Sequence, residues 1–261
     1  MIKIYTYFHR RPDFADLQIR SLKKYLKEEY ELTIFNNAKF DTNKNNYNEI
    51  NRICDEYGVK VLDVDKDEKL IDFYYQYEKA IGNEIFSGDG SYINPNVAVA
   101  YALCYMWDKF MCKEQDKVVF LQHDVFLSEP INFTQSMGNN ELLYIPQVRM
   151  RDNGEPINYM WNTFFLADVA KIPEPETMNW WCGSVDGTRV DVGGQTYKYL
   201  DDHPDVKIKL IPHNEVTEFG SQRMMLGNKS VIHYYRGSNW DNQSEDWHKR
   251  KTEWLLKTLD L

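Results

Sequence analysis

The chain opens with an alternation of apolar and polar residues from Ile2 to Phe8, which is the period of a strand. Pro12 and Asp13 then supply a helix start, and the apolar positions after them recur at helical spacing. The same alternation between the hydrophobic spacing of strands and that of helices predicts a second strand at 32–35, a helix at 47–57 that ends at Gly58, and a third strand at 59–64. Strands that alternate with helices predict an α/β fold, in which a mostly parallel sheet is flanked by helices and binds ligands at the carboxyl ends of its strands.

Two later stretches follow no clear period. Residues 66–93 are rich in aromatic side chains, and the chain after Pro130 is dense in Trp, Gly and Pro, so we predict irregular structure in both. Between and after them, the pattern predicts a helix at 95–110, an apolar strand from Lys117 that runs into the polar triplet Gln122-His123-Asp124, strands at 206–211 and 230–234, and a final helix at 245–259.

Length and charge limit the classes of protein that this chain can represent. Its 261 residues are 43% hydrophobic, which is enough to fill the core of one large domain, so we expect a single domain over residues 1–261. The formal net charge is -9 at pH 7 and the isoelectric point is about 5.2. Binding to a phosphate backbone relies on clustered Lys and Arg, so the composition predicts no nucleic-acid partner.

The cysteines and the apolar runs indicate a cellular setting. No pair of cysteines has the Cys-x-x-Cys spacing of a zinc or redox site, so free buried thiols are expected. No apolar run approaches the roughly 18 residues of a membrane span, and the chain begins at once with a strand pattern, so we expect a cytoplasmic protein without a transmembrane segment. The cationic stretch from Trp247 to Trp254 predicts a solvated helix face, with peripheral contact to an anionic membrane as the alternative.

The most informative residues are the polar triplet at the end of the strand that begins at Lys117. An aspartate held at the end of a buried strand is a fixed ligand, which is what an enzyme needs to hold a divalent metal against a diphosphate. The triplet resembles the metal-binding strand end of GT-A glycosyltransferases, where Asp-x-Asp is usual. Gln122 stands in place of the first carboxylate, and Asp124 in place of the second.

Other segments follow one another in an order that is similar to the GT-A glycosyltransferases, and more narrowly to bacterial and viral enzymes of the family-2 type. Together they touch most of the chain, and their order is more specific than any one of them. The segments are Thr6-Tyr7 with Arg10 and Pro12, Asn36-Asn37-Ala38, Asn94 to Trp107, Phe120 to Pro130, Asp191 to Gly194, and Ile232 to Trp240.

This resemblance implies a GT-A type fold with a Rossmann-like sheet, in which residues 1–130 bind the nucleotide sugar and an irregular half, 131–261, binds the acceptor. It implies a hexosyltransferase-like enzyme of glycan biosynthesis. Such an enzyme moves a sugar from a nucleoside-diphosphate sugar, of UDP or GDP type, to a hydroxyl of a glycan or glycolipid acceptor, with inversion. The implied cofactor is a divalent metal, Mn²⁺ or Mg²⁺, which stabilises the charge on the departing nucleoside diphosphate.

The resemblance also assigns the donor nucleoside to the ends of the first three strands. Side-chain amides suit this role because they both donate to and accept from the edge of a pyrimidine base. Asparagine equally favours strand-end turns for backbone reasons, so a structural role stays open. Arg11, with Arg10, is expected either to neutralise the diphosphate or to be solvated in a loop. The candidates for base and ribose contacts are Thr6, Phe8, Asn36, Asn37 and Asp65.

For the metal, the resemblance implies Asp124 as first ligand and His233, at the end of a late apolar strand, as a second. We therefore expect Asp124 and His233 to lie close together in space. Gln122 is suited to a ribose hydroxyl or a metal-bound water, and His123 either joins the donor site or packs as a structural imidazole. The donor-rich run after His233 is suited to phosphate oxygens through Arg236, Ser238 and Asn239.

An inverting transfer requires a base that removes the proton of the acceptor hydroxyl. Asp191 is the candidate, because the glycines Gly193-Gly194 after it would admit a substrate close to the backbone. Asp186 and Asp168 are competitors for this role. The alternative for Asp191 is that it only caps a helix.

Two other functions remain compatible with these residues. A non-catalytic sugar-binding protein on the same fold would tolerate Gln122 in place of the first carboxylate. A metal-dependent phosphoesterase would need several converging ligands, for which the candidates are His123, Asp124, His213 and His233.

Overall fold

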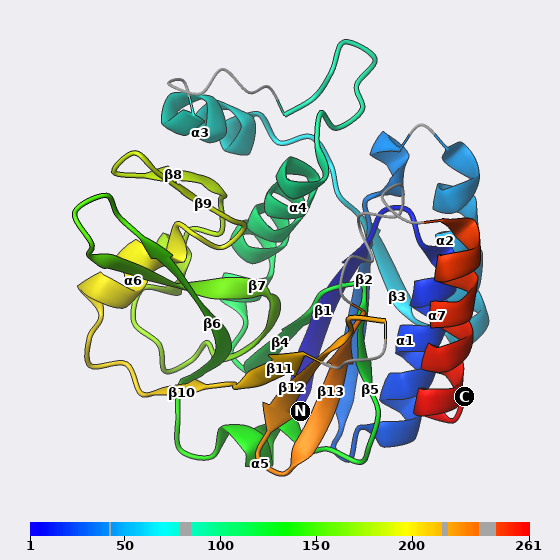
Figure 1. Ribbon diagram of the computed structural model, residues 1–261. Helices are drawn as coiled ribbons and strands as arrows, with labels where there is room; N and C mark the ends of the chain where they lie inside the picture. Colours follow the sequence, from blue (N-terminus) through cyan, green and yellow to red (C-terminus); the bar gives the residue numbers. More distant parts are fainter. Residues whose placement is uncertain (42, 79–84, 216–218, 235–243) are drawn as a thin grey trace.

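The computed structural model describes residues 1–41, 43–78, 85–215, 219–234 and 244–261 (Figure 1). They form a seven-stranded central sheet in the order β10-β6-β7-β4-β1-β2-β3. All neighbours are parallel except the two pairs that include β7, which runs antiparallel to β4 and β6. The expected α/β class with a mostly parallel sheet is therefore confirmed. The strands are β1 Ile2–Phe8, β2 Tyr30–Asn36, β3 Lys60–Asp63, β4 Lys117–Leu121, β6 Leu142–Met150, β7 Pro156–Asp168 and β10 Ile208–Leu210.

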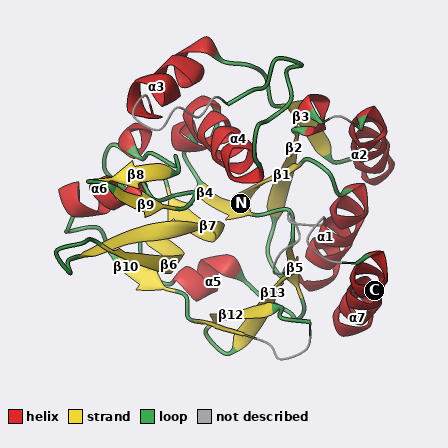
Figure 2. Ribbon diagram, turned by 45° about the horizontal axis from the view of Figure 1, so that its top comes forward, coloured by secondary structure: helices red, strands yellow, loops and turns green. Residues whose placement is uncertain are grey.

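Helices cover both faces of this sheet (Figure 2). Along β1 the side chains alternate, so that Ile4 and Phe8 join the core beneath α1, α2 and α7, whereas Tyr5 and Tyr7 join the core beneath α4. The helices are α1 Pro12–Tyr25, α2 Lys44–Tyr57, α3 Glu68–Glu78, α4 Pro95–Lys109, α5 Phe133–Met137, α6 Thr196–Asp202 and α7 Glu245–Leu259, with short 3-10 turns at Ala38–Phe40, Met111–Lys113 and Pro175–Thr177.

Local sequence explains where several helices begin and end. Pro12 and Pro95 lie in the first turns of α1 and α4, where a missing N–H costs nothing. The side chains of Asn94 and Ser244 accept hydrogen bonds from the backbone of α4 and α7. Gly58 ends α2 at φ +62°, a left-handed conformation that glycine adopts without strain.

A second, four-stranded sheet has the order β11-β12-β13-β5 and is antiparallel throughout. Because β4 ends at Leu121 and β5 begins at Val125, the chain passes from the central sheet to this one within the triplet Gln122-His123-Asp124. The strands of the second sheet are β5 Val125–Leu127, β11 His213–Glu215, β12 Gln222–Leu226 and β13 Lys229–His233, and a separate hairpin is formed by β8 Gly183–Val185 and β9 Thr188–Val190.

Two of the sequence predictions are wrong. The stretch 66–93 is not irregular throughout, because it contains helix α3. The half 131–261 is not irregular either, since it contributes β6 and β7, the longest strands of the central sheet. The end of β7 is apolar on both faces, with Phe164 and Leu166 in the core beneath α1 and Phe165 and Ala167 in the core beneath α4, so it has no alternation to detect.

Among the helices that lie within the described ranges, none combines the length and the apolar character needed to cross a membrane. The cationic stretch of α7 is divided between two environments. Lys249 and Arg250 are exposed, whereas Lys251 is fully buried, with its ammonium group 3.9 Å from the ring centroid of Tyr234 and 4.8 Å from that of Trp247. The face that α7 turns to solvent therefore lacks one of its predicted cations.

Candidate functional site

Asp124 lies in the short turn that joins β4 to β5, at the carboxyl end of a buried strand. The backbone N–H of Gln122 donates to the carbonyl of Thr163 in β7 (2.9 Å), and the N–H of Val125 donates back to the carbonyl of Gln122 (3.0 Å). The turn is thus tied to the central sheet at one end and closed on itself. The side chain of Asp124 is almost completely buried, at 1% exposure.

His233 is the partner of Asp124, as the sequence predicted. It pairs with Val125 across β13 and β5, and its Nε2 lies 3.5 Å from Asp124 Oδ1. The backbone N–H of Tyr234 also donates to the carbonyl of Asp124 (2.8 Å), which fixes the two segments against each other. The expected proximity of Asp124 and His233 is confirmed, although they are far apart in sequence.

The second nitrogen of His233 determines what the first can do. Nδ1 lies 3.1 Å from the side-chain oxygen of Gln222 on β12, an acceptor, so Nδ1 carries a proton and donates it there. In the neutral ring, the lone pair of Nε2 then points toward the carboxylate of Asp124. Two acceptors that face each other in a buried place require a cation between them, either a proton or a metal ion.

The residues present fit a divalent metal. Asp124 Oδ1 is buried and has no hydrogen-bond donor, so it is a polar atom whose partner is missing. Within the described part of the chain, no group of three or more His, Cys, Asp or Glu converges as a complete ligand set. A metal at Asp124 and His233 would therefore draw its other ligands from outside these side chains, as Mg²⁺ does when one or two protein ligands and the phosphates of a substrate share it.

Burial and the nearby imidazoles shift the pKa of Asp124 in opposite directions. Burial alone would raise the pKa of this carboxyl, but its interactions with His123 and His233 outweigh burial and lower its pKa. Asp124 is therefore ionised at neutral pH. Burial lowers the pKa of His123, which favours its neutral form.

His123 packs as a structural imidazole. Its ring lies among those of Tyr7, Phe8 and Phe14, with centroid separations of 5.5, 6.3 and 6.3 Å. Its Nδ1 is buried without a hydrogen bond. Of the two roles that the sequence left open for His123, the contacts favour packing.

Thr6 and Phe8 on β1 are both fully buried. Phe8 belongs to the core beneath α1, and the hydroxyl of Thr6 has no hydrogen-bond partner. Neither side chain reaches the surface at the end of β1. Asp65, in contrast, is exposed beyond the end of β3, where it forms an ion pair with Lys39.

Asn36 and Asn37 lie at the end of β2, and their amides already have partners inside the protein. Asn36 donates to the carbonyl of Tyr47 (3.0 Å) and the side chain of Asn51 (2.8 Å), and it accepts from the backbone of Ala38 (3.1 Å). Asn37 Oδ1 accepts from the hydroxyl of Tyr92 (2.7 Å). Both side chains are fully buried, so these contacts account for asparagine at both positions through the strand-end turn.

Arg11 also has internal contacts. Its guanidinium donates to both carboxylate oxygens of Asp13 (2.8 and 2.5 Å) and lies 3.6 Å from the ring centroid of Phe14. Arg10 forms an ion pair with Asp41 at 3.3 Å. The other expected phosphate contacts, Arg236, Ser238 and Asn239, lie outside the described residues.

The three candidate bases occupy different places. Asp168 pairs with Lys117 at the start of β4, so it lies at the edge of the sheet opposite to Asp124. Asp186 is exposed in the β8–β9 turn, 3.3 Å from Arg151. Asp191 follows β9 and is partly buried, with one oxygen accepting from the backbone N–H of Val192 (2.9 Å). Asp168 and Asp186 are each held in an ion pair with a cationic side chain, whereas Asp191, just after a strand end, forms no ion pair within the described residues.

The glycines beside Asp191 do not leave room for a substrate. A Cβ on Gly193 would meet the backbone oxygen of Met160 at 2.2 Å, and a Cβ on Gly194 would meet the side chain of Val190 at 2.3 Å. The reason given for these glycines is therefore wrong: they allow α6 to approach β7 and β9, and the space is filled by protein.

Sequence patterns did not point to Gln222, which contacts His233, nor to the contact of Trp161 with the same ring. Gln222 orients the ring from β12, and the ring of Trp161 on β7 lies edge-on at 5.4 Å between centroids. The register of the β12–β13 hairpin, whose turn contains Gly227, is the one local signal that places Gln222 opposite His233.

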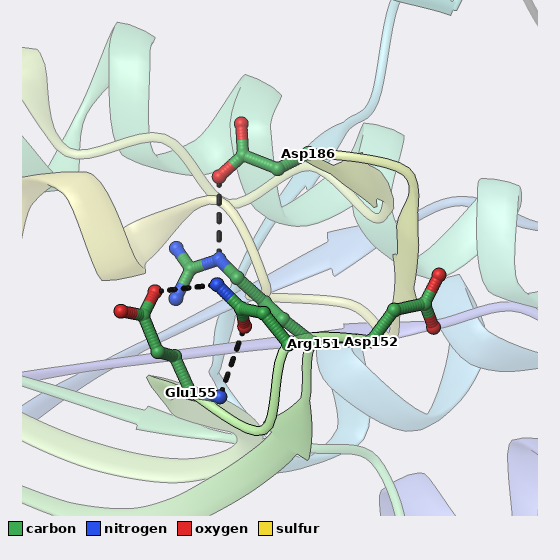
Figure 3. Close-up of a pocket in the computed structure, with 5 residues that line it drawn as sticks. Arg151, Asp152, Glu155 and Asp186 are labelled. Carbon is green, nitrogen blue, oxygen red and sulfur yellow. Dashed lines mark hydrogen bonds and ion pairs between the residues drawn. The ribbon is translucent and has the colours of Figure 1, made fainter.

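A polar hollow of about 420 Å³ lies away from these residues, between the β6–β7 turn and the β8–β9 turn (Figure 3). Arg151 reaches across it to Asp186, and Glu155 and Asp152 lie at its rim. Arg151 pairs with Asp186, the amide of Asn153 donates to the carboxylate of Glu155 (3.0 Å), and these residues belong to turns at the surface.

No protein-family model and no curated protein matches this chain. Among solved structures it is similar to mouse xyloside xylosyltransferase 1 in its apo form, with 14% identity, a TM-score of 0.47, and coverage of 80% of this chain and 85% of that chain. It is also similar to the galactosyltransferase LgtC with donor and acceptor sugar analogues (12% identity, TM-score 0.36, 78% and 66% coverage) and to an active-site mutant of LgtC (13%, 0.36, 78% and 65%). These structural neighbours are glycosyltransferases, and at such identities the likeness concerns the fold alone.

Proposed function

We propose that this protein is a metal-dependent glycosyltransferase of GT-A type, which transfers a sugar from a nucleoside-diphosphate sugar to a hydroxyl of a glycan or glycolipid. One observation carries the proposal. The buried Oδ1 of Asp124, which has no hydrogen-bond partner, faces Nε2 of an oriented histidine, His233, at 3.5 Å, just beyond the carboxyl end of a central parallel strand. Open α/β sheets bind ligands at that edge.

In this proposal Asp124 and His233 hold Mn²⁺ or Mg²⁺ from two different sheets. The bound ion supplies a Lewis acid that stabilises negative charge on the leaving diphosphate. Gln222 keeps the proton of His233 on Nδ1, so that Nε2 stays available. The nucleoside, of UDP or GDP type, would lie over the ends of β1–β3, where Asn36 and Asn37 shape the turn and Asp65 is exposed.

The acceptor half of the proposal rests on residues 131–261, with Asp191 as the base of an inverting displacement. Its partial burial and its place after β9 support this role. A base of this kind accepts the proton of the attacking hydroxyl while the oxygen approaches the anomeric carbon. The cytoplasm is the proposed setting, and the four cysteines, all without disulfides, agree with a reducing compartment.

Release of nucleoside diphosphate from a panel of UDP- and GDP-sugars, with and without Mn²⁺, tests this function. We expect slow metal-dependent release with one donor, accelerated by a glycan acceptor. Stabilisation by a donor without any release would support the non-catalytic binding protein instead. Hydrolysis of simple phosphoesters without sugar transfer would support the phosphoesterase, which the described residues do not favour because they lack a converging set of three ligands.

A further inference from the structure

Helix α1 carries two polar residues on its buried face, Gln18 and Ser21, and Gln18 is the only one of them with an amide side chain. Gln18 is 1% exposed, and its neighbours on that face, Phe14, Leu17 and Leu22, are apolar core residues. Burying an amide costs free energy unless hydrogen bonds replace its water, and an apolar residue of the same size would avoid this cost. A glutamine at this position therefore calls for a specific set of contacts.

The contacts of Gln18 converge on the turn that carries Asp124. Its side-chain NH₂ donates to the carbonyl of Gln122 and to the carbonyl of Val125, both at 2.8 Å. These carbonyls lie at the two ends of the turn, so the amide of Gln18 binds both ends at once. The side-chain oxygen of Gln18 is buried without a hydrogen bond, so the two bonds donated by its NH₂ group are what account for a glutamine at this position.

One helical turn earlier, Phe14 contacts the neighbours of both proposed metal ligands. Its ring stacks on that of His123 at 6.3 Å between centroids and meets that of Tyr234 at 4.9 Å. Residues four apart on a helix share one face. Gln18 and Phe14 thus form a single surface that supports the turn of Asp124 and the end of β13.

We propose that Gln18 is a positioning residue, which holds the turn between β4 and β5 so that Asp124 stays at ligand distance from His233. This inference rests on the proposed metal-binding role of that pair. The turn connects two different sheets, and Oδ1 of Asp124, the oxygen that faces His233, is buried without a hydrogen-bond partner. Partners that orient a metal ligand typically change metal affinity by about 10- to 100-fold when they are removed.

The test compares Gln18→Met with Ser21→Ala. Methionine keeps the length of the side chain and removes both donors, whereas Ser21 is a buried hydroxyl on the same helix that contacts Leu127 beyond the turn. We expect Gln18→Met to weaken Mn²⁺ binding, measured by electron paramagnetic resonance, at least about tenfold. Ser21→Ala should stay within about twofold of the parent. A Gln18→Met value within twofold of the parent, or equal losses in both variants, would overturn the proposal.

Hydrogen exchange separates this inference from the proposed function. The amides of Val125 and Tyr234 donate to the carbonyls of Gln122 and Asp124, so they report the turn whether or not a metal binds. We expect them to exchange faster in Gln18→Met, and to a smaller degree in the milder Gln18→Asn, while Phe120 in β4 is unchanged. A parent that binds no Mn²⁺ would refute the metal site, whereas unchanged exchange at Val125 and Tyr234 would refute the role of Gln18.

Discussion

Gly193→Ala should destabilise the protein far more than Gly187→Ala, although the two glycines have almost the same φ, +86° and +82°. A Cβ on Gly187 meets nothing within 4 Å, so this variant carries only the strain of a left-handed conformation. That strain is about 1–2 kcal/mol, partly offset by the lower entropy of the unfolded chain, by about 0.4–1 kcal/mol. We expect Gly187→Ala to lower the free energy of unfolding by about 1 kcal/mol.

Gly193→Ala adds a collision with a fixed backbone atom. The new Cβ would lie 2.2 Å from the carbonyl oxygen of Met160. The N–H of Met160 donates to the hydroxyl oxygen of Thr196 (3.0 Å), and its strand pairs with β6, so this backbone is held in place. Overpacking of this kind costs about 1–3 kcal/mol beyond the strain. For a chain of this size, each kcal/mol corresponds to about 2–4 °C in Tm.

Urea unfolding of the parent and both variants, followed by circular dichroism, measures the difference. A drop for Gly193→Ala that exceeds that of Gly187→Ala by about 2 kcal/mol is expected. Equal stabilities would refute the argument that Gly193 is needed for close packing of α6 on β7. If Gly193→Ala then lost activity alone, the glycine would serve a substrate after all.

Asp191→Asn should retain donor binding and lose transfer by about a hundred- to ten-thousand-fold, because the amide cannot accept the proton of the acceptor hydroxyl. Steady-state kinetics measure this loss. A product that keeps the configuration of the donor would exclude Asp191 as the base. Burial raises the pKa of the Cys54 thiol to about 12 and that of Cys104 well above its usual value, while Cys112 is only partly buried. Iodoacetamide at pH 8, with peptide mass spectrometry, should therefore label Cys112 first in the native protein, and labelling of Cys54 at the same rate would contradict the packing of α2.

Local signals predicted the first half of the fold. Pro12 and Gly58 mark helix boundaries through their own backbone preferences, so β1, α1, β2, α2 and β3 could be predicted from short windows of sequence. Strand β7 could not, because its end packs into a core on each face of the sheet and therefore leaves no period in the sequence. Helix α3 was missed because its aromatic residues obscured the helical spacing.

The candidate site likewise contains some residues that could be predicted from the sequence and others that could not. Asp124 follows the apolar strand β4 and His233 ends the apolar strand β13, and the family resemblance implied that they lie close together, but the second sheet that brings them together was not predicted. The roles of Gln18 and Gln222 depend on contacts with distant segments, which no spacing reveals. Asn36 and Asn37 show the opposite difficulty. An amide that is suited to contact a nucleotide base is equally suited to stabilise a strand-end turn, so the residue type alone does not separate the two roles.

Binding of Mn²⁺ to the parent and to Asp124→Ala, in the presence of the preferred nucleoside diphosphate, tests the central claim most directly. Asp168→Asn is the matched control, since Asp168 is a buried carboxylate at the opposite end of β4. Titration followed by electron paramagnetic resonance should give one site in the parent and in Asp168→Asn, and a loss of about a hundredfold or more in Asp124→Ala. Unchanged Mn²⁺ affinity in a folded Asp124→Ala protein would contradict the account.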